Sequence, residues 1–247
     1  MLALANLAFV AMLVSGLATG LRLVLAAARN GRAPELWIGL STLLAAVGGV
    51  IDTAALRLAH ADPAGAAFTL QAAARLCYVF SSTGLGVGIW RIFRPQGYWG
   101  AVLTFAIAMV SAGAWGAYAA GGLHSFATGA TASLVWLYLG RMAPYAWAAA
   151  ESFAYHGRLR RQLRLGLAEP LIAHQFLLWG VASSAMLGLI GVILGVYWWL
   201  GITPLETPVG LVPMAVFGLV GASTIYTAFF PPAFYRRWIL RRAAPAR

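Results

Sequence analysis

The sequence predicts an all-helical membrane protein, a bundle of seven transmembrane helices with its amino terminus outside and its carboxyl terminus in the cytoplasm. Its 247 residues are 62% hydrophobic and only 9% charged, whereas about a quarter of the residues of a soluble globular protein are charged. The apolar residues form long runs, and the arginines lie between alternate runs. Lipid is therefore the expected solvent of this chain.

The apolar runs set the number of helices. About 30 Å of hydrocarbon is crossed by roughly 20 helical residues, and seven runs reach that length. They cover residues 2–28, 36–59, 67–90, 98–120, 126–151, 171–200 and 209–232. The first run has no charge before Arg22, whereas a secretory signal carries positive charge ahead of its apolar stretch. We therefore expect this run to remain in the mature protein.

The distribution of arginine predicts the orientation. Thirteen arginines lie between alternate helices or in the tail, and the loops around residues 60–65, 121–125 and 201–208 contain none. Basic residues accumulate in cytoplasmic loops of membrane proteins. These arginines are Arg29, Arg32, Arg91, Arg94, Arg158, Arg160, Arg161, Arg164, Arg236, Arg237, Arg241, Arg242 and Arg247. Because they sit at helix ends, the net charge of +11 indicates topology and not nucleic-acid binding.

Two basic segments follow helices. Residues 155–169 and the tail, residues 234–247, mix arginine with leucine or aromatic residues, which predicts helical extensions or helices on the anionic inner leaflet. Their arginines either set the topology alone or form a docking surface for a cytoplasmic partner. The docking candidates are Arg158, Arg160, Arg161, Arg164, Arg236 and Arg237.

Charged residues within the apolar runs are functional candidates, because burying a charge in a bilayer is costly. Asp52 and Arg75 lie at similar depths, roughly 11 Å from the outer ends of two consecutive helices at 1.5 Å per residue. Consecutive antiparallel helices are usually neighbours, so we expect an ion pair between them. The pair either fixes helix packing or lines a ligand cavity or proton path that opens to the outside.

Arg141 has no acidic residue at helical spacing before Glu151. Its guanidinium could be neutralised by packing partners, or it could recognise an anionic group by bidentate hydrogen bonds. The partners expected are Glu151, backbone carbonyls freed by a proline, and the hydroxyls of Ser223, Thr224 and Tyr226.

Aromatic and histidine residues give weaker signals. Trp136 and Trp179 fall nearer the middle of their runs and either line an apolar pocket, with Tyr226 as a further candidate, or pack between helices. His60, Asp62 and His124 lie in outer loops and could ligate a metal, but they share no metal-binding spacing, and solvated loop residues are the alternative. No nucleophile, base and orienting group can be combined, so an enzyme is not expected.

The predicted topology resembles that of microbial rhodopsins and G-protein-coupled receptors. Rhodopsins hold retinal through a lysine, and this sequence contains no lysine, so covalent retinal is excluded and no cofactor is expected. The Pro34-Glu35 and Glu169-Pro170 pairs, each between an arginine-bearing loop and the next helix, indicate a three-plus-one-plus-three internal repeat, with chance similarity as the alternative.

Three functions are consistent with these features. The leading hypothesis is a sensor or receptor-like protein that binds a small or lipophilic ligand between its helices and signals to a separate cytoplasmic partner. The alternatives are a small-solute transporter built on the repeat, and an accessory subunit of a larger membrane complex. The richness in alanine, glycine and arginine, without lysine, favours a bacterial cytoplasmic membrane.

Overall fold

The computed structural model describes residues 2–58, 65–121, 132–201 and 207–243, and within them it contains helices and no strands. The expected all-helical class is therefore confirmed. The helices are α1 (Leu2–Asn30), α2 (Ala33–Leu58), α3 (Ala66–Phe93), α4 (Tyr98–Gly121), α6 (Ala132–Arg164), α7 (Pro170–Leu200), α8 (Pro208–Phe229) and α9 (Ala233–Ala243).

Helix ends follow from local chemistry. Pro170 and Pro208 stand at the first position of α7 and α8, where a missing N–H costs nothing, and the Thr207 side chain accepts a hydrogen bond from Gly210 N. Gly201 ends α7 in the left-handed conformation at φ 64°, which glycine adopts without strain. Pro231 and Pro232 separate α8 from α9, as the sequence predicts.

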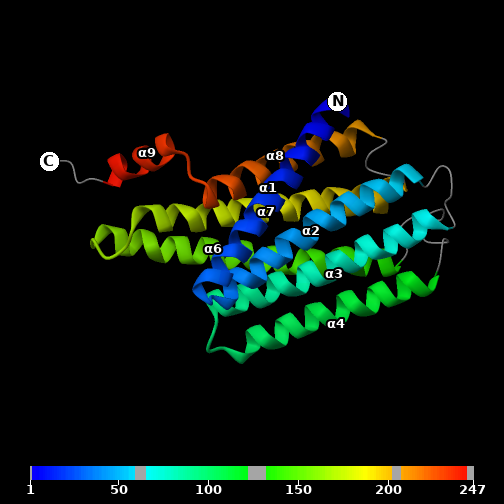
Figure 1. Ribbon diagram of the computed structural model, residues 1–247, viewed down its shortest axis with the longest axis horizontal. Helices are drawn as coiled ribbons and strands as arrows, with labels where there is room; N and C mark the ends of the chain where they lie inside the picture. Colours follow the sequence, from blue (N-terminus) through cyan, green and yellow to red (C-terminus); the bar gives the residue numbers. More distant parts are fainter. Residues whose placement is uncertain (1, 59–64, 122–131, 202–206, 244–247) are drawn as a thin grey trace.

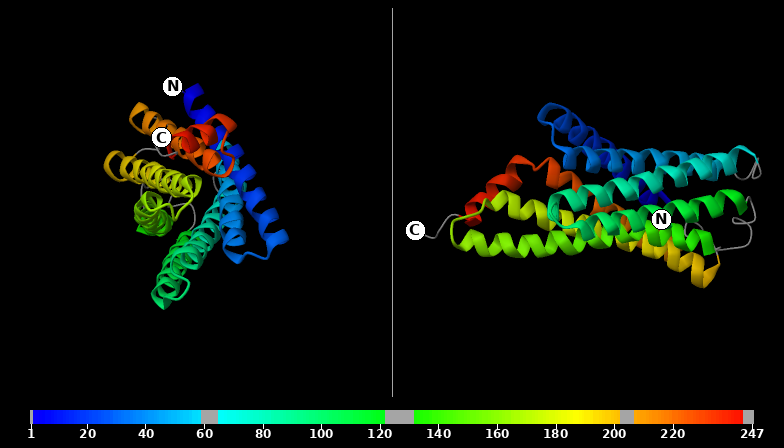
Figure 2. Two further views of the ribbon diagram at one scale, coloured as in Figure 1. Left: turned by 90° about the vertical axis from the view of Figure 1, so that its left-hand side faces the viewer. Right: turned by 90° about the horizontal axis from the view of Figure 1, so that it is seen from below.

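The long helices run side by side in alternating directions (Figure 1) and close into a ring, because α8 packs against both α7 and α1. Each of the other long helices contacts its neighbours in the chain, and α3 also contacts α6 across the ring. A view turned by 90° shows α1 to α4 on one side and α6 to α8 on the other (Figure 2). The candidate site lies where α3, α4 and α6 meet.

Within the described residues, six helices are long and apolar enough to cross a membrane: α1, α2, α3, α4, α7 and α8. These features are those of an integral membrane protein. The fifth predicted segment corresponds to α6, which is less apolar because it carries Arg141, Pro144 and Glu151. The seventh crossing, the orientation and the repeat stay predictions.

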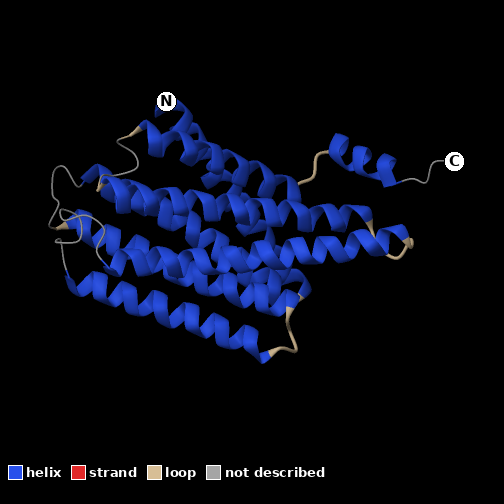
Figure 3. Ribbon diagram, turned by 180° about the vertical axis from the view of Figure 1, so that it is seen from behind, coloured by secondary structure: helices blue, strands red, loops and turns tan. Residues whose placement is uncertain are grey.

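Helix α6 differs most from its expected range. Instead of ending near residue 151 it continues to Arg164, because the arginines, leucines and glutamine of this stretch favour a helix. Its last turns and the start of α7 form a hairpin that projects beyond the ends of α1 to α4 (Figures 1 and 3). The basic segment after residue 151 is thus part of a continuous helix.

The connections that carry the arginines gather at the end of the bundle where this hairpin projects (Figure 1). The tail helix α9 packs against α7 there, with Ile239 only 2% exposed and His174 against the rings of Tyr235 and Trp238. All six docking candidates, Arg158, Arg160, Arg161, Arg164, Arg236 and Arg237, have exposed side chains.

Candidate functional site

The ion pair expected between the second and third helices is present. Arg75 Nη1 lies 3.5 Å from Asp52 Oδ2, and the two side chains are 10% and 19% exposed. Asp52 is on α2 and Arg75 on α3, which pack along their lengths. Each charge reduces the cost of burying the other, as buried charges require.

Arg75 also reaches α6. Its Nη1 donates to the hydroxyl of Tyr138 at 3.4 Å, and its guanidinium carbon lies 5.6 Å from the ring centroid of Tyr138 and 6.0 Å from that of Tyr78. Two buried atoms of the ion pair, Arg75 Nε and Asp52 Oδ1, have no hydrogen-bond partner among the described residues. The pair thus retains unused hydrogen-bonding capacity.

Arg141 has none of the side-chain partners expected from the sequence. Its guanidinium carbon lies over the ring of Tyr78, 3.7 Å from the centroid, in a cation–π contact. Glu151 instead accepts from Arg94 Nε at 2.8 Å, which joins α6 to the end of α3 and raises the pKa of Arg94. Glu151, one of the candidate partners of Arg141, is therefore paired with Arg94 instead.

The hydroxyl groups of α8 are also occupied. Ser223 and Thr224 donate to carbonyls of their own helix at 2.7 and 2.6 Å, as such residues do in apolar surroundings. Tyr226 stacks on Phe230 with 4.9 Å between centroids and is 43% exposed. The contacts of α8 are with α1 and α7, on the far side of the ring from Arg141.

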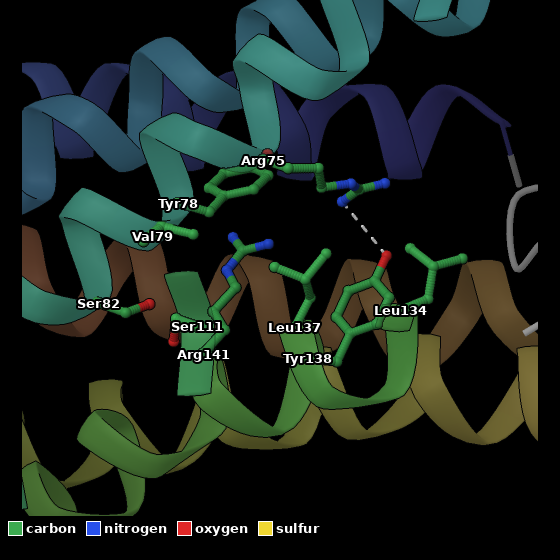
Figure 4. A pocket seen from close by; sticks show the side chains of 9 residues that line it. All are labelled: Arg75, Tyr78, Val79, Ser82, Ser111, Leu134, Leu137, Tyr138 and Arg141. Carbon is green, nitrogen blue, oxygen red and sulfur yellow. Dashed lines mark hydrogen bonds between the residues drawn. The ribbon is translucent and has the colours of Figure 1, made fainter. Parts of the chain in front are cut away.

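Arg75 and Arg141 line one small pocket, with a cavity of about 10 Å³, between α3, α4 and α6 (Figure 4). The two guanidiniums reach it from opposite walls, with the ring of Tyr78 between their contacts. Its nine lining residues are Arg75, Tyr78, Val79, Ser82, Ser111, Leu134, Leu137, Tyr138 and Arg141. Helices α3 and α6 each contribute both polar and apolar side chains to this lining.

Close approach of α4 and α6 shapes this pocket. A Cβ atom on Gly140 would collide with the hydroxyl of Ser111, so glycine at this position lets α4 and α6 approach closely without displacing that hydroxyl. Ser111 is 2% exposed, and its hydroxyl has no hydrogen-bond partner within the part of the chain that the structure describes. The hydroxyl is therefore buried in the pocket lining with its bonding capacity unused.

Sequence reasoning missed Tyr78, Tyr138 and Ser111. A signal for the two tyrosines was present: Tyr78 follows Arg75 by three residues and Tyr138 precedes Arg141 by three, spacings that place side chains on one helix face. Ser111 has no such signal, because its position depends on how α4 packs against α6.

The other predicted residues lie away from this pocket. Trp136 is near the start of α6 and is 54% exposed, and it is not among the residues that line this pocket. Trp179 contacts Phe176 and Phe229 at 6.0 and 5.6 Å between centroids and packs α7 against α8. His60, Asp62 and His124 fall outside the described residues, within which no three metal-ligating side chains cluster.

The arginine-rich end has its own anchoring contacts. His156 Nδ1 lies 2.7 Å from the carbonyl oxygen of Ala173, which ties the last turns of α6 to α7. Partial burial of Tyr235 against this hairpin raises the pKa of its phenol. The hairpin and α9 therefore form one packed unit with an arginine-covered surface.

This chain matches no protein-family model, no curated protein and no solved structure. The assignment of function therefore rests on the geometry of the pocket and the helices that form it.

Proposed function

We propose that this chain is a seven-helix membrane sensor that binds a small ligand in the pocket around Arg75 and Arg141 and signals to a separate cytoplasmic partner. In this proposal α6 is the seventh crossing, since its 33 residues are long enough and its charges lie inside the ring or at its end. The arginine-bearing end is cytoplasmic and the amino terminus is outside, in a bacterial cytoplasmic membrane.

The main support for this proposal is that α6 is one continuous helix from the pocket to the exposed arginines at its carboxyl end. Its early turns supply Leu134, Tyr138 and Arg141 to the pocket, and the same helix continues to Arg164. Helices transmit displacement as rigid units, so movement at the pocket would reach the hairpin.

Pro144 gives α6 a place to bend. It lies one turn beyond Arg141 inside the helix and has no N–H to donate to the carbonyl of Gly140. A ligand that draws Arg141 toward α3 would change the angle between the two parts of α6. The pocket and the exposed arginines lie on opposite sides of this proline.

Photo-crosslinking in native membranes tests the signalling role. A benzophenone side chain introduced at Gln162, beside the docking arginines, is expected to give one discrete adduct, and joint replacement of Arg160, Arg161 and Arg164 by Gln is expected to abolish it. The same group at Phe105, an exposed apolar position on α4, serves as the matched control and should label lipid.

Other results would change the assignment. Adducts from Phe105 alone would favour the accessory subunit, because the partner would then lie within the bilayer. No adduct at Gln162, or one that survives loss of the three arginines, would contradict a partner at this surface.

A transporter is the second candidate, and the Asp52–Arg75 ion pair, whose arginine lines the pocket, favours it. In that case flux of labelled chloride into proteoliposomes should fall when Asp52 or Arg75 is replaced by Ala. Arg57→Ala is the control, because its side chain is exposed on the same helix as Asp52. Flux no greater than in empty liposomes would remove this candidate.

A further inference from the structure

We propose that the small pocket between α3, α4 and α6 binds a single halide ion, of the size of chloride or smaller, with the Arg141 guanidinium as its counter-charge. This inference rests on the proposed function, because it assigns the ligand class of the same pocket. Three features of the pocket favour a halide: its net positive charge, its size and the unpaired donors in its lining.

The pocket has one positive charge more than its nearest carboxylate neutralises. Arg75 and Arg141 both line it, and Asp52 lies 3.5 Å from Arg75 Nη1. The structure gives Arg141 no ion pair and no hydrogen bond with another described residue, only the ring contact with Tyr78. A ring attracts a cation but carries no net charge, so a buried guanidinium with this contact alone remains unneutralised. A monoanion in the pocket would balance the charge.

The other carboxylates among the described residues are not available to Arg141. Glu35 pairs with Arg32, and Glu151 pairs with Arg94. Glu169 is exposed at the amino-terminal end of α7. Within the part of the chain that the structure describes, no side chain therefore supplies the missing negative charge, which favours an anion from solution.

The size of the cavity restricts this anion to one atom. The cavity is about 10 Å³, and one water molecule needs roughly 10–15 Å³. Carboxylates, nitrate and phosphate have several heavy atoms and do not fit this space, whereas a halide has one. Fluoride is close to water in size and chloride is slightly larger, so chloride fits after a small movement of the arginine side chains. Iodide is too large.

The lining also contains hydrogen-bond donors without an acceptor. Ser111 Oγ and Arg75 Nε are buried and have no partner among the described residues, and the two residues are only 2% and 8% exposed. Ser111 lines the pocket from α4 and Arg75 from α3. Buried donors without a partner are costly. Because a halide is spherical, it accepts hydrogen bonds from any direction and does not require donors in one plane.

The contact between Arg141 and Tyr78 leaves the guanidinium able to donate. The face of the guanidinium lies over the ring, 3.7 Å from its centroid, so the N–H groups at its edge remain free. Figure 4 shows Arg141 extending from α6 toward Tyr78 and Arg75 extending from α3 toward α6. A halide that accepts from this edge would receive a charge-assisted hydrogen bond.

Thermal unfolding of the full-length protein in nanodiscs tests the proposal. Chloride replaces gluconate at constant ionic strength, and a site that binds only the folded protein is expected to give a saturable rise in the unfolding temperature. Arg141→Gln should weaken the chloride affinity about tenfold or more, because the counter-charge is lost. Ser111→Ala should weaken it by a smaller factor, about threefold.

The order of the halides separates this site from nonspecific binding. Adsorption of anions to a basic protein favours iodide, which is less strongly hydrated than chloride. A cavity of the observed size predicts the reverse, with a larger rise from chloride than from iodide. Broadening of the chlorine NMR line by the protein gives a second measurement that does not depend on unfolding.

Matched variants control for charge and folding. Arg57→Gln removes an exposed arginine from α2 and should leave the chloride response unchanged. Arg141→Lys keeps the positive charge and should retain part of the affinity. Each variant is compared with itself in gluconate, so a change in its stability without chloride does not alter the reading.

An equal chloride response in wild type and Arg141→Gln would overturn the proposal, as would an iodide response as large as that of chloride. Absence of a saturable chloride response would also overturn it and would leave a cavity that holds water alone. Failure of the signalling proposal is distinct: chloride would then bind through Arg141 while the Gln162 adduct stays absent. The adduct without a chloride response would remove the halide and leave the signalling role.

Discussion

Replacing Asp52 by Asn tests how the buried ion pair contributes to stability. The change removes the negative charge 3.5 Å from Arg75 Nη1 and leaves the shape of the side chain nearly unaltered. At an effective dielectric constant of about 20, two unit charges at this distance attract by roughly 5 kcal/mol. The loss is smaller than this, because Arg75 keeps its hydrogen bond to Tyr138 and its ring contacts. We expect about 2–3 kcal/mol of destabilisation.

Steric trapping or denaturation in mixed micelles measures this difference directly. The matched control is Glu35→Gln, which breaks the ion pair to Arg32, whose side chain is 69% exposed. Exposed pairs of this kind contribute about 0–0.5 kcal/mol. Equal effects of the two substitutions would refute the reasoning that burial makes the Asp52 pair strong.

A double-mutant cycle sharpens the test. Arg75→Gln alone leaves Asp52 without its cation, and the double variant Asp52→Asn, Arg75→Gln has neither charge in the interior. Coupled residues give non-additive losses, so the double variant should be less destabilised than the sum of the single ones by about 1–3 kcal/mol. Additive losses would show that the two side chains act independently.

Gly140→Ala should destabilise the bundle by about 1–3 kcal/mol in the same unfolding assay, because its methyl group meets a pocket hydroxyl, whereas Gly113→Ala, with open space around its Cβ, should not destabilise it. Leu137→Ala should destabilise the bundle by about 2–5 kcal/mol in that assay, because Leu137 is 8% exposed, whereas Trp136→Ala, at a position that is 54% exposed, should have a smaller effect. Ile239→Ala should release α9 at a cost of about 2 kcal/mol, seen as faster amide exchange confined to that helix.

The helical class and the approximate helix positions could be predicted because they depend on local composition. A run of about 20 apolar residues must form a helix in lipid, where backbone groups have no water to bond. The ends were less certain, as α6 shows: the Arg-rich stretch after Glu151 is polar, so hydropathy ended the segment there, while its helix propensity continued the helix to Arg164.

The ion pair could be predicted because the depth of a residue in the membrane follows from its position along its helix. Asp52 and Arg75 lie at similar depths on consecutive helices. The partner of Arg141 could not be predicted from depth. Its contact with Tyr78 joins α6 to α3, helices that are not consecutive in the chain, and sequence spacing says nothing about which rings such a guanidinium meets. The exposure of Trp136 and Tyr226 likewise depends on the rotation of each helix about its axis.

The sequence alone determined that the chain is made of long apolar helices and that its arginines mark one end of them, since hydropathy and charge are properties of residue type. Only the tertiary structure decided that Arg75 and Arg141 share a pocket, because the ring formed by α1 to α8 brings α3, α4 and α6 together. Close packing against Gly140 then brings Ser111 into the pocket lining, a contact between residues 29 positions apart in the chain. The chemistry of the site arises from that packing.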